Sequence, residues 1–284
     1  MGLDYKNLSV RTISGLVYAG LLVGAIVLGP WAMAIVGSVF AVIACYELEG
    51  NSVRRDNPSN WKLTWYIDAA ALVFLIFSFA GSNHSTALCA CIFIALLFLR
   101  FFMQLFIKQE NVLKSISLFP FSLLYIGVPL SMLVAAVASV SNPWIIVCAI
   151  AMIWINDTGA YLVGCTLGSH KMFPRLSPKK SWEGFLGGLA FNISAAFIFY
   201  YCFDLRNNDI LANVDGWIFI GLCVTAFATL GDLFESMIKR SLGIKDFGTI
   251  IPGHGGVLDR IDSLLFVVPC LVAAIFVGLQ MFWY

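Results

Sequence analysis

Residues 216–238 read GWIFIGLCVTAFATLGDLFESMI, an apolar run that carries Asp232 and Glu235 near its end. About 20 apolar residues, each rising ~1.5 Å, cross the hydrocarbon layer of a bilayer as one α-helix. We therefore expect a membrane-spanning helix here. An ionisable group inside such a helix is costly unless it is neutralised, so both carboxylates are candidates for function.

The rest of the chain is equally apolar. Of its 284 residues, 60% are hydrophobic and 12% are charged, and the mean hydropathy is +0.90. This composition leaves too little polar surface to cover a water-soluble globule, so the sequence predicts an all-α, polytopic integral membrane protein. Because the net charge is only +1, the chain has no overall basic field, and we expect no nucleic-acid partner.

The apolar segments predict about nine transmembrane helices in two regions. Residues 1–150 hold about five N-terminal transmembrane helices, and residues 151–284 form a C-terminal transmembrane region whose polar motifs and cytoplasmic loops are expected to carry the function. The Gly29-Pro30 break leaves open a tight hairpin or one broken element. The nine segments are 12–29, 31–48, 64–81, 86–107, 116–140, 143–167, 183–203, 216–238 and 262–283.

The lysine and arginine residues predict the orientation, because cationic loops resist translocation. If the N-terminus is cytoplasmic, all 17 of these residues except Arg206 and Arg100 lie on the cytoplasmic side. Arg100 lies within the fourth segment near its cytoplasmic end, where its long side chain can reach the interface. We expect a multi-pass protein of the cell (inner) membrane, with its C-terminus on the opposite side.

Acidic side chains reach one depth of the predicted bundle. Counted at helical rise from the outer ends of their helices, Asp157 lies ~21 Å and Asp232 ~24 Å into a layer about 30 Å thick. Asp262 lies at the cytoplasmic boundary of the last segment. Asp232, Glu235 and Lys239 share one helix face, which leaves open a Glu235–Lys239 ion pair or a functional site.

A divalent cation held by two aspartates would neutralise their charge and so lower the cost of placing carboxylates at this depth of the membrane. Mg²⁺ prefers oxygen ligands and takes one or two carboxylates, with waters and substrate phosphates in the other positions. Two stretches suit a phosphate-bearing substrate: the glycine-rich loop 242–262, and residues 175–184, where Lys179 and Lys180 precede a helix N-terminus. The alternative is that both stretches are ordinary basic turns beside the membrane.

Four stretches of the C-terminal region form a recognisable pattern. Two lie upstream, at Asp157-Thr-Gly-Ala-Tyr161-Leu-Val-Gly164 and Ser177-Pro-Lys-Lys180-Ser-Trp-Glu-Gly184. The others are Gly231-Asp232 with Ser236-Met-Ile-Lys239-Arg240, and Lys245-Asp246 with Pro252-Gly-His254-Gly-Gly-Val-Leu-Asp259-Arg260-Ile-Asp262. This pattern resembles the motifs of the phosphatidate cytidylyltransferase family, also called CDP-diacylglycerol synthase.

The resemblance implies a homodimeric, all-helical membrane enzyme with a cytoplasm-facing polar cavity. Its reaction joins CTP to phosphatidic acid and gives CDP-diacylglycerol and pyrophosphate, so the expected partners are both substrates, the bilayer and a second copy. The family's two metal-binding aspartates match Asp232 and Asp259, and Mg²⁺ is the expected cofactor. The sequence leaves open a second cation, monovalent or divalent.

The remaining roles follow from charge, because such a transfer needs positioning and charge neutralisation more than a covalent intermediate. We expect the basic residues to neutralise phosphate oxygens and Asp246 and Asp262 to orient them, while His254 either donates to a phosphate or fills the turn. Catalytic candidates are Asp232, Asp259, Lys239, Arg260 and Asp262. Substrate-binding candidates are Lys179, Lys180, Ser177, Arg240, Lys245, Asp246, His254 and Asp157.

Two other functions remain open at this point. An ion-coupled transporter would use Asp157, Asp232 and Glu235 as a cation path, but the sequence has no inverted repeat and its polar groups gather at one face rather than at mid-membrane. A CTP-dependent lipid kinase would transfer the γ-phosphoryl group and release CDP.

Overall fold

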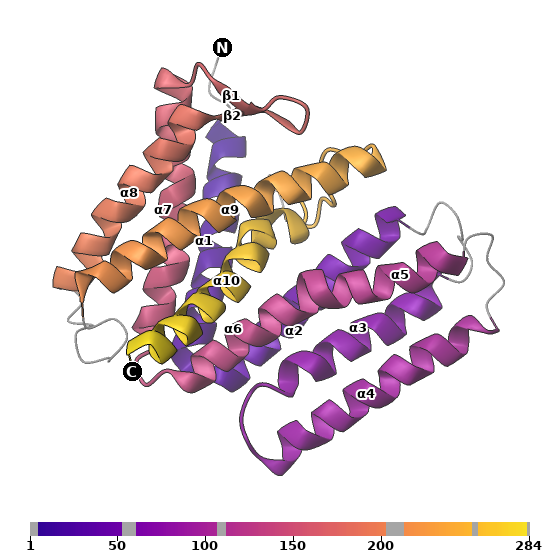
Figure 1. Cartoon of the computed structure of the whole chain (residues 1–284). Helices are drawn as coiled ribbons and strands as arrows, with labels where there is room; N and C mark the ends of the chain where they lie inside the picture. The colour runs from indigo at the N-terminus through magenta and orange to yellow at the C-terminus, as the bar shows by residue number, and fades with distance from the viewer. Residues whose placement is uncertain (1–4, 53–60, 107–111, 203–212, 252–254, 283–284) are drawn as a thin grey trace. The chain divides into compact units, whose positions relative to one another are not determined.

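The computed structural model describes residues 5–52, 61–106, 112–202, 213–251 and 255–282 (Figure 1). These residues are largely helical, with one two-stranded hairpin. The elements are α1 (Tyr5–Leu28), α2 (Pro30–Ser52), α3 (Trp61–Phe77), α4 (His84–Gln104), α5 (Val112–Ser122), the π-helical turn η1 (Leu123–Gly127), α6 (Val128–Ser139), α7 (Trp144–Leu167), β1 (Lys171–Phe173), β2 (Ser177–Ser181), α8 (Trp182–Cys202), α9 (Val214–Leu242) and α10 (Leu258–Phe282).

Each of the nine apolar segments expected from the sequence coincides with helical structure, the fifth being α5, η1 and α6 in succession. Six of the described helical stretches are long and apolar enough to cross a membrane, which confirms a polytopic membrane protein. The count of nine spans stays a prediction. The six are Pro30–Ser52, His84–Gln104, Ser115–Ser139, Trp144–Leu167, Trp182–Tyr201 and Val214–Leu242, and Thr12–Leu28 is a shorter apolar helix.

The Gly29-Pro30 break is a tight hairpin. Gly29 has a φ of 107°, a left-handed conformation that glycine adopts without steric strain, and Pro30 starts α2 directly after it. The rings of Tyr18 on α1 and Phe40 on α2 stack with centroids 5.8 Å apart, so the two helices pack against each other. One glycine is therefore enough to separate the first two helices.

The chain forms two compact units. The first comprises Met1–Ser141 and Leu242–Ile261, and the second comprises Asn142–Ser241 and Asp262–Tyr284. The segment that carries Asp259 thus packs with the N-terminal helices, although it lies far along the chain. The domain boundary expected at residue 150 stays a prediction.

In the first unit, α2 packs against α1, α3 and α6, and α3 packs against α4. A buried polar network runs between these helices: the Arg100 guanidinium donates to Asp68 at 2.7 Å and to Gln104 at 2.8 Å. Arg100 is only 2% exposed, so the expectation that its side chain reaches the membrane interface is wrong. The ion pair with Asp68 satisfies the buried charge instead.

In the second unit, α7 and α8 pack closely because glycines face the neighbouring helix. A Cβ added at Gly187 would lie 2.4 Å from Val163 Cβ, and one added at Gly188 would lie 2.4 Å from Asn156 Oδ1. The antiparallel β1–β2 hairpin connects these two helices (Figure 1). Close packing of α7 on α8 thereby fixes the base of a hairpin that carries Ser177, Lys179 and Lys180.

Candidate active site

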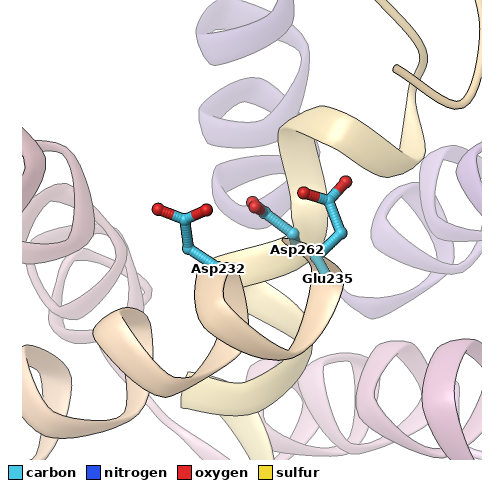
Figure 2. Close-up of side chains that lie close together, drawn as sticks. All are labelled: Asp232, Glu235 and Asp262. Atoms are coloured by element: carbon cyan, nitrogen blue, oxygen red, sulfur yellow. The ribbon is translucent and has the colours of Figure 1, made fainter. Parts of the chain in front are cut away.

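Three carboxylates meet where α9 passes the first turns of α10 (Figure 2). The side chains of Asp232, Glu235 and Asp262 each offer an oxygen, and these oxygens all lie within 4.8 Å of one another. Asp232 and Glu235 share one face of α9, as their i, i+3 spacing predicts. Carboxylates this close repel one another unless a cation or a proton lies among them, and an all-oxygen donor set suits Mg²⁺.

A glycine allows α9 and α10 to approach at this point. A Cβ added at Gly231 would lie 2.9 Å from the Asp262 carbonyl oxygen and 3.1 Å from Phe266 Cβ. Two further contacts join the helices: Ser263 Oγ donates to the Ala228 carbonyl at 3.4 Å, and the rings of Phe234 and Phe266 lie 5.1 Å apart. Gly231 therefore sets how closely the acidic residues of the two helices approach.

Gly231→Ala is expected to force α9 away from α10, because the obstructing atoms include backbone that cannot rotate aside. We expect a loss of about 1–3 kcal/mol of stability, typical of overpacking, and a lower midpoint of thermal unfolding in detergent. Gly24→Ala in α1 is the matched control, since an added Cβ there meets no described atom within 4 Å. Equal midpoints for the two variants would contradict the close approach at Gly231.

Two lysines neutralise this acidic cluster. Lys180 Nζ lies 2.7 Å from Asp232 Oδ2 and also donates to the Thr229 carbonyl at 3.2 Å. Lys239 Nζ lies 2.5 Å from Glu235 Oε2, so the ion pair that the sequence left open is formed. Lys239 is thus held on α9 by an acidic neighbour, while the Asp232 side chain remains 42% exposed.

A pocket of about 290 Å³ lies beside Asp232 within the second unit. Its lining brings together Asp157 from α7, Ser177 and both lysines of β2, and Asp232 from α9. All five were substrate or metal candidates from the sequence, and the structure places them around one cavity. Two ammonium groups and a hydroxyl on one wall suit an anionic, phosphate-bearing ligand.

The start of the hairpin that carries the lysines is bound by Glu183, in the first turn of α8. The Glu183 carboxylate accepts from the backbone N–H of His170 at 3.1 Å and from the Ser169 hydroxyl at 2.9 Å. The Trp182 N–H donates to the His170 carbonyl at 2.9 Å. Ser181 Oγ accepts from the Gly184 N–H at 3.1 Å, which caps the predicted helix start.

Asp259 lies in the first unit, in the first turn of α10. Its Oδ2 accepts from the backbone N–H groups of Phe247 at 3.0 Å and of Gly256 at 2.8 Å, and the residue is 8% exposed. These bonds close the glycine-rich loop onto the start of α10. The metal role of Asp259 stays a prediction.

Glu47, which was not predicted as a site residue, contacts the same loop. Glu47 on α2 is 3% exposed, and its carboxylate accepts from the backbone N–H groups of Val257 and Leu258. The position of Glu47 inside an apolar segment already indicates a buried partner, because an acidic residue there is costly without one. Glu47 lies in the predicted segment 31–48, outside the motifs that resemble the family's.

Residues 9–278 match the family described as "Cytidylyltransferase family". The chain belongs to this family. The resemblance drawn from the motifs is thereby confirmed.

Three curated relatives of the chain are named phosphatidate cytidylyltransferase. The Staphylococcus aureus protein is 46% identical over 125 residues, which are 43% of this chain and 45% of the relative. The Haemophilus influenzae protein is 48% identical over 120 residues, 42% and 41% of the two chains. The Staphylococcus haemolyticus protein is 42% identical over 125 residues, 43% and 45%. The match spans less than half the length of these relatives.

The other family-motif residues lie outside the described pocket. Arg240, Lys245, Asp246 and Arg260 are exposed, so their side chains are accessible to a ligand. Their roles toward phosphate remain predictions. His254 falls in residues 252–254, outside the described part of the chain, and the choice between its two expected roles stays open.

Proposed function

We propose that this cytidylyltransferase-family protein transfers the cytidylyl group of CTP to phosphatidic acid. The products are CDP-diacylglycerol and pyrophosphate. The observation that carries the proposal is the pocket lined by Lys179, Lys180 and Asp232, the last of which belongs to the Asp232–Glu235–Asp262 cluster. The names of the relatives support the same reaction.

In the proposed reaction, an oxygen of the lipid phosphate attacks the α-phosphorus of CTP. The bond from that phosphorus to the bridging oxygen breaks, and pyrophosphate leaves in line with the attack. A phosphate monoester is already anionic near pH 7, so no strong general base is needed. The protein's task is to align two polyanions and to neutralise their repulsion.

In this proposal, acidic side chains bind the metal or orient basic groups, and basic side chains bind phosphate oxygens. Asp232 and Asp259 are the proposed Mg²⁺ ligands, and a bound Mg²⁺ would neutralise charge on the triphosphate. Lys179 and Lys180 hold phosphate oxygens from the pocket wall, with Ser177 and Asp157 beside them. Lys239, Arg240, Lys245 and Arg260 neutralise further phosphate charge, with Asp246 and Asp262 orienting them and His254 as a further contact. A second cation is compatible with the number of carboxylates.

The proposal includes the placement of the protein. The polar cavity faces the cytoplasm, nine helices span the cell membrane, and the C-terminus lies on the side opposite to the N-terminus. The distribution of lysine and arginine supports this orientation. The working form is a homodimer, as the resemblance implies.

A product assay tests the proposed reaction. The purified protein in detergent is given phosphatidic acid, Mg²⁺ and CTP labelled at either the α- or the γ-phosphorus. We expect the α-label in a liponucleotide and the γ-label in pyrophosphate. A γ-label in the lipid would show a CTP-dependent kinase, and the absence of label transfer with cation flux in vesicles would show a transporter; either result overturns the proposal.

Lys180→Met is expected to lower kcat/KM by about 10- to 100-fold, because a hydrogen bond to a charged group contributes about 1.5–3 kcal/mol. Lys171→Met is the matched control: this lysine lies on β1 of the same hairpin, is exposed and is not part of the pocket lining. Initial rates at varied CTP and varied phosphatidic acid measure both variants. Equal losses for the two variants would remove the specific role of Lys180.

A further inference from the structure

We propose that Glu47, on the N-terminal helix α2, is a positioning residue that holds the glycine-rich loop and the start of α10, and thereby presents Asp259. Only the catalytic consequence of this inference rests on the proposed function. The contact of Glu47 with the loop does not depend on that function and is tested separately.

The first observation is the fit of one carboxylate to one helix end. Glu47 Oε1 accepts from the Val257 N–H at 3.0 Å, and Oε2 accepts from the Leu258 N–H at 2.9 Å. These N–H groups belong to the first turn of α10 and its cap, where no intrahelical acceptor is available. The helix dipole also favours an anion at this end. A residue 210 positions earlier in the chain thus caps α10.

The second observation is how closely the loop backbone approaches Glu47. A Cβ added at Gly248 would lie 2.5 Å from Glu47 Oε1, and one added at Gly256 would lie 2.6 Å from the same oxygen. Only glycine leaves room for the carboxylate at both places. Asn51, one turn further along α2, donates to the Phe247 carbonyl at 2.8 Å. α2 therefore holds the loop at two points.

The third observation links this hold to Asp259. The Asp259 carboxylate accepts from the N–H groups of Phe247 and Gly256, which directly precede Gly248 and Val257 in the chain. Glu47 and Asp259 thus accept from neighbouring backbone N–H groups at residues 256–258, and both lie against the backbone at residues 247–248. If Glu47 is lost, the amides that orient the Asp259 carboxylate lose their anchor. Outer contacts of this kind typically change metal affinity or activity by about 10- to 100-fold.

Glu47→Gln is the sharpest test, because it keeps the shape and changes one oxygen to NH₂. Each carboxylate oxygen accepts a different N–H group, so the amide must face one backbone donor with another donor. Glu49→Gln is the matched control. Glu49 lies on the same helix, is also 3% exposed, and its carboxylate accepts from Cys45 Sγ.

Hydrogen–deuterium exchange tests the hold without any reference to activity. In the full-length protein in detergent, we expect the amides of Val257 and Leu258 to exchange at least about 10-fold faster in Glu47→Gln than in the wild type, with Glu49→Gln unchanged at these amides. Unchanged exchange in Glu47→Gln overturns the inference. This result is independent of which reaction the protein catalyses.

Kinetics then separate positioning from general stability. In Glu47→Gln we expect the Mg²⁺ concentration for half-maximal turnover to rise about 10-fold, while the KM for phosphatidic acid stays within about twofold of the wild-type value. Glu47→Asp, which keeps the charge, should recover part of the loss. An unchanged Mg²⁺ requirement, or the same increase in Glu49→Gln, overturns the positioning role. If no liponucleotide forms even in the wild type, the proposed function fails while the exchange result stands.

Discussion

Asp232→Asn is expected to lower CTP turnover by at least about 100-fold while leaving the protein folded and inserted. The carboxylate lines the pocket, pairs with Lys180 at 2.7 Å and belongs to the three-carboxylate cluster. Asparagine has nearly the same shape but no charge, so the change removes the charge, the proposed metal ligand and the ion pair with Lys180 while keeping the size of the side chain. Losses of 10²- to 10³-fold are typical when one group that stabilises charge in a transition state is removed.

Asp215→Asn is the matched control for this variant. Asp215 lies in the first turn of the same helix α9, is exposed and lies far along the helix from the cluster. We expect wild-type turnover from it in the radiolabelled CTP assay, and thermal midpoints close to the wild type for both variants. If Asp232→Asn turned over CTP as fast as Asp215→Asn does, Asp232 would not be part of the reacting site.

Asp259→Asn is the second change with a large expected effect, again a loss of turnover of at least about 100-fold. The asparagine carbonyl oxygen can still accept from Phe247 and Gly256, as Asp259 Oδ2 does. The loop should therefore keep its conformation, and the exchange rates of its amides should stay near those of the wild type. The activity loss would then come from the missing charge and metal ligand.

The assay for Asp259→Asn is metal-dependent CTP turnover with phosphatidic acid, over a range of Mg²⁺ concentrations. Loss of activity together with fast amide exchange would assign Asp259 to loop structure alone. Turnover near the wild-type rate at ordinary Mg²⁺ concentrations would show that the metal assignment is wrong.

The helices follow from hydropathy because a helix in lipid satisfies its own backbone hydrogen bonds, whatever its neighbours are. For the same reason, all nine expected apolar segments are helical, with ends close to those predicted. The Asp232–Glu235 face and the start of α8 are also local features. They depend on residue spacing within one helix and on a capping serine.

The sequence alone did not predict contacts between residues that lie far apart in the chain. Asp68 neutralises Arg100 across two helices, so Arg100 is buried rather than directed to the interface. Glu47 reaches backbone amides more than 200 residues away, and such a contact leaves no spacing pattern. The β1–β2 hairpin was also missed, because its short strands resemble turn sequence.

The same limit applies to the choice between two alternatives on α9. Spacing alone allowed Glu235 and Lys239 either to pair with each other or to serve a ligand. The structure shows the pair, and it also shows Glu235 beside Asp232 and Asp262. The two alternatives are thus compatible: Lys239 pairs with Glu235, while the Asp232 side chain of the same cluster is still 42% exposed.

The most direct test of the account is metal binding by the purified protein, measured from the electron paramagnetic resonance signal of Mn²⁺ in the presence of a non-reacting CTP analogue. Manganese replaces magnesium at oxygen sites and reports bound and free ion separately. We expect tight binding in the wild type and in Asp215→Asn, and its loss in both Asp232→Asn and Asp259→Asn. Tight binding that survives Asp259→Asn but is lost in Asp262→Asn would contradict the proposed ligand pair and place the ion at the α9–α10 cluster instead.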